Sequence, residues 1–174
     1  MNNHLPSLAA TDVALSLPDG QSLHVGDQRL SERAQQLIGI GETAIAQHDD
    51  AALDAYFAPD FVFHGPTGEA TYPQLKAMFA TFRASFRDFR VTRQAIIENG
   101  PFVAARTSMS GTFAHSLDTP FGPIAPTGNH AQWDLINVFR YDADGRLAEE
   151  WVQYDYAGFM RQLGVTLVAQ KTAP

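Results

Sequence analysis

Two carboxylates lie in segments that alternate between apolar and polar residues, as half-buried strands do. Glu150 shares one strand face with Val152 and Tyr154. A carboxyl group buried among such side chains would have a raised pKa and could act as a general base. In the alternative, Glu150 is an exposed strand residue or forms an ion pair with Arg106 or Arg140.

Asp134 is the second candidate base. Aspartate is disfavoured inside strands, so this side chain needs a partner, which Arg106 or Arg90 could supply. If paired, Asp134 would belong to the scaffold. If unpaired inside a cavity, it would compete with Glu150 for the role of base.

Two histidines could assist such chemistry. His64 ends a short predicted strand, residues 61–64, where it could polarise a ligand carbonyl or simply bond to a loop. His115 lies in a long Gly/Pro-rich connection, residues 112–128, and could cover a pocket or remain solvated. No His-x-x-x-His or His-x-His spacing occurs in the chain, so we predict no metal site.

Aromatic and apolar residues on the same predicted strands could form the wall of a binding site. Tyr154 could donate a hydrogen bond to an oxyanion, whereas the alternative for Tyr154 and Trp133 is packing in a core or an interface. We expect these ligand-binding residues: His115, Tyr154, Trp133, Val152, Phe63 and Arg106.

The segment that must position these residues is a predicted hairpin over residues 131–155. Its two strands meet at Asp144-Gly145, a dipeptide that favours a tight turn. One face of the first strand carries Trp133, Leu135, Asn137 and Phe139. Both faces hold large or apolar groups, so we expect both to be covered.

The remaining elements predict an α+β arrangement. Helical spacing covers residues 31–47, 50–58 and 72–86, and Thr71 with Gln74 fits a capping box at the third helix. Strands are expected at 90–97 and 102–112, joined at Asn99-Gly100, and a closing helix at 156–163. Gly39 and Gly41 suggest a close approach to the first helix. An antiparallel sheet with helices on one face must curl to bury three helical stripes, which leaves a cone with an interior cavity.

Composition excludes several classes of partner. The 174-residue chain has a formal net charge of -7 and no basic run, which argues against nucleic acid and anionic lipid as partners. It has no cysteine, which excludes disulfides and thiolate chemistry. No apolar run approaches the ~18 residues that a membrane span needs, and the N-terminus lacks the pattern of a signal peptide. We therefore expect a cytoplasmic protein.

The chain is expected to hold one domain. We predict an N-terminal arm over residues 1–29, a domain over 30–164 and a C-terminal tail over 165–174. An arm of this kind could pack on a dimer mate.

Several short motifs, taken in order, resemble the SnoaL-like (polyketide cyclase or ester cyclase) family of the NTF2-like superfamily. The resemblance covers residues 31–164 and rests on Tyr56-Phe57-Ala58-Pro59-Asp60, His64-Gly65-Pro66, Ala105-Arg106, Gly111-Thr112, Pro126-Thr127-Gly128, Gly145-Arg146-Leu147-Ala148-Glu149-Glu150-Trp151, and Asp155 followed by Gln162-Leu163-Gly164. It implies an NTF2-like cone, in which a curved antiparallel sheet wraps around N-terminal helices and encloses a pocket.

The resemblance also implies a function and a partner. Members of this family close rings by aldol chemistry without metal or coenzyme, using an aspartate that directly follows the Trp of the last strand. Here that position is Val152, and the His that commonly precedes the Trp is Glu150. The family's catalytic constellation is therefore not carried over, and we do not expect a copy of that reaction. We expect a small, apolar, carbonyl-bearing ligand, with cofactor-free acid/base chemistry of the cyclase, isomerase or hydrolase type and Glu150 or Asp134 as base. NTF2-like domains commonly dimerise through the open sheet face, so the alternative is a non-catalytic binding or dimerisation module.

Overall fold

The computed structural model describes residues 21–24, 30–119 and 122–166. Its strands are β1 (Gln21–His24), β2 (Phe57–Gly65), β3 (Gly68–Thr71), β4 (Phe86–Asn99), β5 (Phe102–Phe113), β6 (Leu117–Thr119), β7 (Gly122–Ile124), β8 (His130–Tyr141) and β9 (Leu147–Tyr154). Seven of them form one sheet in the order β1-β4-β5-β8-β9-β2-β3, and β6 pairs with β7. All sheet neighbours are antiparallel except β2 and β9.

The helices begin at capping side chains that the sequence makes visible. They are α1 (Glu32–Gly39), the π-helix η1 (Ile40–Ile45), α2 (Asp50–Tyr56), α3 (Tyr72–Ser85) and α4 (Tyr156–Gln162). Ser31 caps α1, Asp49 caps α2 and Asp155 caps α4, each accepting a backbone N–H with its side chain. The predicted capping box of Thr71 and Gln74 is present at α3.

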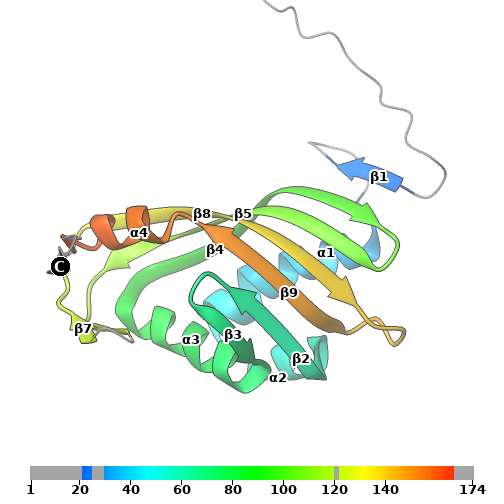
Figure 1. Cartoon of the computed structure of the whole chain (residues 1–174), viewed down its shortest axis with the longest axis horizontal. Coiled ribbons are helices and arrows are strands. Elements are labelled where there is room, and N and C mark those ends of the chain that lie inside the picture. Colours follow the sequence, from blue (N-terminus) through cyan, green and yellow to red (C-terminus); the bar gives the residue numbers. More distant parts are fainter. Residues whose placement is uncertain (1–20, 25–29, 120–121, 167–174) are drawn as a thin grey trace, which may run out of the picture.

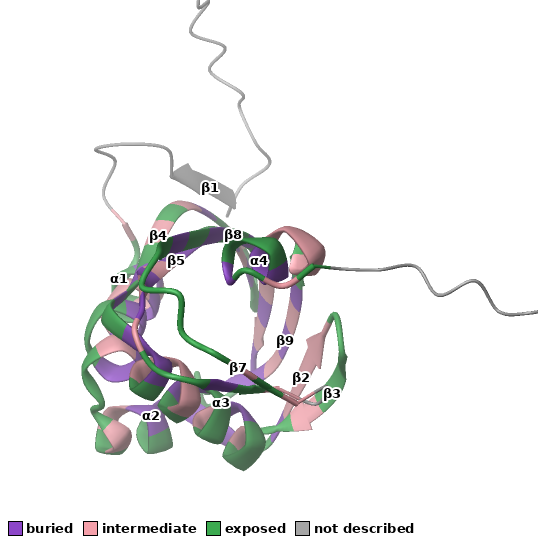
Figure 2. Ribbon diagram, turned by 90° about the vertical axis from the view of Figure 1, so that its left-hand side faces the viewer, coloured by how far each residue is buried: buried purple, intermediate pink, exposed green. Residues whose placement is uncertain are grey.

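The sheet curves strongly around the helical layer. Figure 1 shows the long strands β4, β5, β8 and β9 arching over α1, α2 and α3. Figure 2, turned by 90°, shows the sheet curving around one side while these helices close the other. Apolar residues from both layers form one core inside the cone. The predicted α+β, NTF2-like cone with an internal pocket is confirmed.

The central hairpin forms as predicted from β8 and β9. Gly145 adopts a φ of 78°, and Asp142 Oδ1 accepts hydrogen bonds from the backbone N–H groups of Asp144 and Arg146. One face packs on the core. The other, outer face carries Ile136, which is 56% exposed in the single chain.

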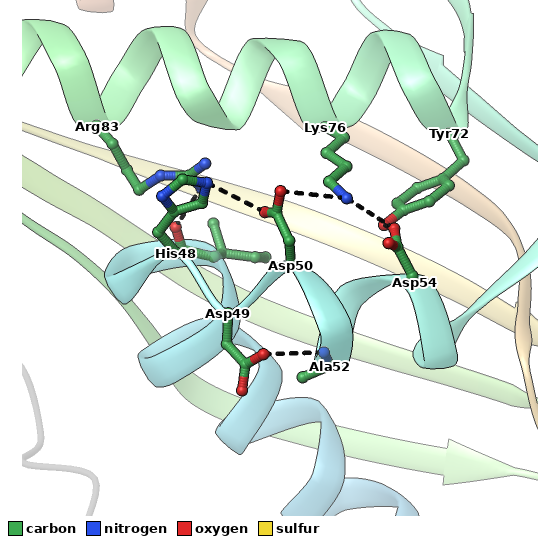
Figure 3. A network of polar contacts seen from close by, with 9 residues as sticks. His48, Asp49, Asp50, Ala52, Asp54, Tyr72, Lys76 and Arg83 are labelled. Atoms are coloured by element: carbon green, nitrogen blue, oxygen red, sulfur yellow. Dashed lines mark hydrogen bonds and ion pairs between the residues drawn. The ribbon is translucent and has the colours of Figure 1, made fainter.

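Polar contacts fasten α2 to α3 at the base of the cone (Figure 3). Lys76 Nζ lies 2.8 Å from Asp54 Oδ1 and 3.3 Å from Asp50 Oδ2, so one ammonium bridges two carboxylates. Tyr72 donates to Asp54, and Arg83 Nη1 donates to the carbonyl of Ile45. These contacts fix the helical floor on which the cavity rests.

Four expectations about elements were wrong in detail. The first helix changes to π geometry at Ile40, and β2 begins at Phe57, within the range 50–58 predicted for the second helix. Phe86 opens β4 instead of closing α3. The connection over residues 112–128 contains the β6–β7 hairpin. A Cβ at Gly41 would lie 3.2 Å from Val91 Cγ1, as expected for a close approach. A Cβ at Gly39 would meet no atom of another described element within 4 Å.

The chain ends are described only in part. Of the predicted arm, residues 1–20 and 25–29 lie outside the described residues, and strand β1 pairs with β4. Of the predicted tail, residues 167–174 lie outside them. No helix within the described ranges is long and apolar enough to cross a membrane.

Candidate functional site

A pocket opens between the inner face of the sheet and the helices. Its walls are mainly apolar and include Leu37, Ile40 and Val152. The polar residues that line it are Tyr56, Thr67, Arg93, Asn137, Glu150 and Tyr154. A few polar groups converging in an apolar cavity are typical of small-molecule sites.

The pocket is narrow. Its volume is about 60 Å³, room for a few water molecules. Phe63, Met78, Phe82 and Tyr154, which line it, are only partly buried or exposed. A ligand of several rings would therefore have to displace these side chains, whose rotation does not require the backbone to move.

Glu150 lies on the pocket wall because of the strand alternation of β9. Glu150, Val152 and Tyr154 face the cavity, and Glu150 is only 7% exposed. Burial raises the pKa of Glu150 to about 7, against the opposing effects of Arg93 and the Asn137 hydrogen bond. The carboxyl group therefore changes its charge near neutral pH.

A chain of side-chain hydrogen bonds holds this carboxyl group. Asn137 Nδ2 donates to Glu150 Oε1 over 2.8 Å, and Asn137 Oδ1 accepts from Thr107 Oγ1 over 2.6 Å. Arg93 Nη1 donates in turn to Thr107 Oγ1. Oε2 of Glu150 receives no hydrogen bond from the described part of the chain, so it is the oxygen left for a ligand.

Arg93 supplies the positive charge of the pocket. Its Cζ lies 5.1 Å from the centroid of the Phe139 ring, which also lines the cavity. Burial lowers the pKa of Arg93, and the nearby charge of Glu150 opposes that effect. The two groups, both within the described residues, form no direct hydrogen bond or ion pair.

Two tyrosines share a hydrogen bond deep in the cone. The hydroxyl oxygens of Tyr56 and Tyr141 lie 2.5 Å apart, and both rings are buried. Burial raises the pKa of Tyr56 well above its usual value and that of Tyr141 to about 12. Both phenols therefore stay neutral through the physiological range.

The structure places five of the predicted site residues at this pocket and four elsewhere. Those lining the pocket are Glu150, Tyr154, Trp133, Val152 and Phe63. The others are Asp134, Arg106, His64 and His115, and none of them lines it.

Asp134 and Arg106 form an ion pair on the outer face of the sheet, with 2.8 Å between Oδ2 and Nη2. This is the paired alternative in which Asp134 belongs to the scaffold.

His64 also projects from the outer face. Its Nε2 lies 2.9 Å from Glu149 Oε1, its Nδ1 lies 3.2 Å from Glu69 Oε1, and its ring stacks on Trp151. Arg140 pairs with Glu149 and not with Glu150. His115 is exposed in the connection after β5, and its backbone N–H donates to Ser85.

Sequence reasoning missed Arg93 and Thr107 and did not assign a role to Asn137. The sequence does hold a signal for them: each is a polar residue on a strand face whose other residues, two positions away, are apolar. Asn137 alternates with Leu135 and Phe139, and Arg93 follows Val91 by two residues. A polar group on a core-facing position must find a partner, which points to a buried network.

Two further observations limit the site. Among the described residues, no group of three or more His, Asp or Glu side chains could hold a metal ion. A hollow of about 610 Å³ lies at Ile124, Tyr156 and Met160, and its lining has no carboxylate, imidazole or cationic group. A second hollow, of about 320 Å³, is lined by Asp134 and Asp155 beside α4. Asp134 is paired with Arg106, and Asp155 caps α4.

Comparison with known proteins agrees with this geometry. A family model for SnoaL-like polyketide cyclases matches residues 35–163. The structure is similar to IdmH from Streptomyces antibioticus, a proposed polyketide cyclase, with 27% identity, a TM-score of 0.63, and 78% of this chain and 100% of that chain covered. It is also similar to TsrD from Streptomyces laurentii, with 25% identity, a TM-score of 0.66, and 78% and 98% covered.

A third likeness concerns the fold alone. AclR from Streptomyces galilaeus, a proposed hydroxylase, is 20% identical, with a TM-score of 0.65, and the match covers 78% of this chain and 98% of that chain. No functionally curated protein matches the sequence.

Proposed function

Because the chain belongs to the SnoaL-like polyketide cyclase family, we propose that its cone binds a small, largely apolar ketone and removes a proton from the carbon beside the carbonyl. Glu150 is the base. The observation that carries this proposal is its position: a carboxyl group on the inner wall, buried among aromatic residues, with a pKa near neutrality and one oxygen free.

The proposed step conserves charge and atoms. Oε2 of Glu150 takes the proton, the C–H electron pair forms a carbon–carbon double bond, and the carbonyl oxygen becomes an enolate oxyanion. Asn137 keeps the carboxyl group oriented through Oε1. The enolate can then attack a second carbonyl of the same molecule, which closes a ring, or be reprotonated at another carbon.

The proposal differs from the usual family pattern in the position of the base, because Val152 stands where the family has its aspartate. The position directly after Trp151 carries an apolar side chain that lines the pocket. In our proposal the base has moved by two residues along β9, from position 152 to Glu150. Both positions face the same side of the strand, so the carboxylate still points into the cone.

A purely non-catalytic module is less well supported. That alternative predicts that both candidate carboxylates are locked to arginines and that Phe and Trp side chains fill the cavity. The cavity keeps a volume of about 60 Å³. Asp134 is paired with Arg106, whereas within the described ranges the side chain of Glu150 is hydrogen-bonded only to the amide of Asn137. One carboxylate therefore remains available inside the pocket.

Deuterium exchange tests the proton-transfer step without knowledge of the natural substrate. 2-Tetralone is an apolar two-ring ketone with acidic hydrogens beside its carbonyl. We expect the protein to accelerate its exchange in D2O, and Glu150→Gln to reduce that acceleration by about 100-fold or more. Glu149→Gln, on the outer face, is the matched control. Full acceleration in the Glu150 variant, or none in the wild type, would rule out the proposed base.

We also propose that the chain forms a homodimer through the outer face of the sheet. Ile136, Ile97 and Phe102 on this face are 56%, 46% and 41% exposed. Large apolar side chains gathered on one face are typical of an interface, and a second copy of this chain presents the same patch.

A further inference from the structure

The wall of the pocket holds a guanidinium group whose hydrogen-bonding capacity is only partly used. Arg93 Nη1 donates to Thr107, and the group lies over the Phe139 ring. Its Nε is fully buried and has no hydrogen-bond partner among the described residues. A buried charged donor without an acceptor lowers stability, so its presence in an apolar cone requires an explanation.

The surroundings of Arg93 keep this donor in place. Helix η1 packs against it, since a Cβ added at Gly41 would lie 3.7 Å from Arg93 Nε and 3.2 Å from Val91 Cγ1. Thr107 fixes the far end of the guanidinium group. The guanidinium group is therefore positioned from two sides by the protein itself, and preorganised donors are those that stabilise an anion most efficiently.

The charges in the pocket indicate what kind of ligand group could bind Arg93. When Glu150 is protonated, Arg93 is the only formal charge among the residues that line the pocket. When Glu150 is ionised, the two charges balance across the hydrogen-bond chain of Asn137 and Thr107 without meeting. Transfer of a proton from a ligand to Glu150 would move the negative charge from the carboxylate onto the ligand. The positive charge of Arg93 would then lack a counter-charge unless the ligand anion lies beside the guanidinium group.

We propose that Arg93 binds a delocalised oxyanion of the ligand, the enolate oxygen formed when Glu150 takes the proton. The inference rests on the function proposed above and adds a further catalytic residue to it. The Arg93 guanidinium could also donate to a carboxylate carried by the ligand, because an enolate and a carboxylate both present an anionic oxygen to a planar guanidinium.

Binding of 4-nitrophenolate tests this assignment apart from catalysis. The probe is an apolar ring with a delocalised oxyanion, and its visible absorbance reports its ionisation. Binding is measured at pH 8 in the Glu150→Gln background, which mimics the protonated carboxyl and has no base at that position. We expect the added Arg93→Met change to weaken phenolate binding by about tenfold or more.

Two further variants keep the result interpretable. Arg106→Met removes a guanidinium from the outer face of the neighbouring strand and should change the dissociation constant by less than about twofold. Arg93→Gln is a second neutral replacement that retains a donor for Thr107, should Arg93→Met fold poorly. If neutral replacement of Arg93 in a folded protein leaves phenolate binding unchanged, or if the Glu150→Gln parent binds no phenolate, the assignment is wrong.

Benzoate distinguishes the two sources of such an oxygen. Benzoate binding that depends on Arg93 as strongly as phenolate binding indicates a ligand carboxylate. Dependence confined to the phenolate indicates the enolate. If phenolate binding depends on Arg93 while 2-tetralone exchange does not depend on Glu150, Arg93 retains its role and the proposed base alone fails.

Discussion

Three carboxylates on the central hairpin have the same chemistry and different environments. The hydrogen bond from Arg106 lowers the pKa of Asp134, and that from His64 lowers the pKa of Glu149. Burial instead raises the pKa of Glu150 to about 7. Environments that separate pKa values in this way also separate roles, and only the raised group faces the cavity.

Glu150 should make stability fall as pH rises. Its folded pKa of about 7 lies above the unfolded value near 4.5, so the folded state holds the proton more tightly. That contribution is complete below about pH 4.5 and is lost as pH rises through 7. Between pH 5 and pH 8 this group should cost the wild type on the order of 3 kcal/mol of its free energy of unfolding. We expect Glu150→Gln not to show this loss when both proteins are unfolded in urea.

The control for this prediction is Glu149→Gln. The pKa of Glu149 is lowered, so its contribution to stability is present at neutral pH and lost on acidification. The two variants should therefore change the pH dependence in opposite directions. Identical pH dependence in wild type and Glu150→Gln would contradict a raised pKa.

The sequence predicted the face of Glu150 but not that of His64. Alternation along β9 was enough for Glu150, whose strand neighbours Val152 and Tyr154 also line the pocket. For His64 the sequence shows only a place at a strand end, which does not define a face. The parallel pairing of Phe63 with Glu150 turns Phe63 inward and His64 outward, and a pairing partner cannot be read from one strand.

At the scale of elements, Gly111 and Gly39 differ in how closely their surroundings are packed. A Cβ at Gly111 on β5 would lie 2.9 Å from Phe86 Cβ and 3.2 Å from the carbonyl oxygen of Arg87. A Cβ at Gly39, at the α1–η1 junction, would have no other part of the described chain within 4 Å beyond its own helix. Gly39 has helical backbone angles, with φ of -56° and ψ of -42°.

Alanine at these two positions should have opposite effects. Gly111→Ala forces β4 away from β5, and we expect it to lower the free energy of unfolding by about 1–3 kcal/mol. Gly39→Ala should raise it by up to about 1 kcal/mol, since alanine is the better helix former. Chemical denaturation of both variants measures the difference. Equal effects would contradict the packing described at Gly111.

Local signals predicted elements well where side chains act on their own backbone. Thr71 with Gln74 marked a helix start that the structure contains, and Ser31 and Asp155 cap two further helices. The π geometry of η1 and the bulge between Arg93 and Ala95 had no such signal. They depend on how η1 packs against β4, which periodicity does not report.

At the scale of the molecule, one face of the curved sheet is covered by helices and the other is exposed to solvent. The inner face packs on the helices, while the outer face of the described chain carries exposed Ile136. We expect wild type to sediment as a dimer at micromolar concentration and Ile136→Glu to sediment as a monomer, because a buried unpaired carboxylate opposes association.

Ala80→Glu, on the exposed side of α3, is the control and should stay dimeric. A monomeric wild type, or an Ile136→Glu variant that remains dimeric, would show that this face is not the interface.

The most direct test of the central claim is the titration of Glu150 itself. Carbon NMR of the labelled glutamate side chains, with Glu150→Gln used for assignment, follows the Glu150 carboxyl group as pH changes. We predict a midpoint near 7, because the carboxyl group is buried in the cone. A midpoint between about 4 and 5, as in a solvated glutamate, would contradict both the burial and the role as general base.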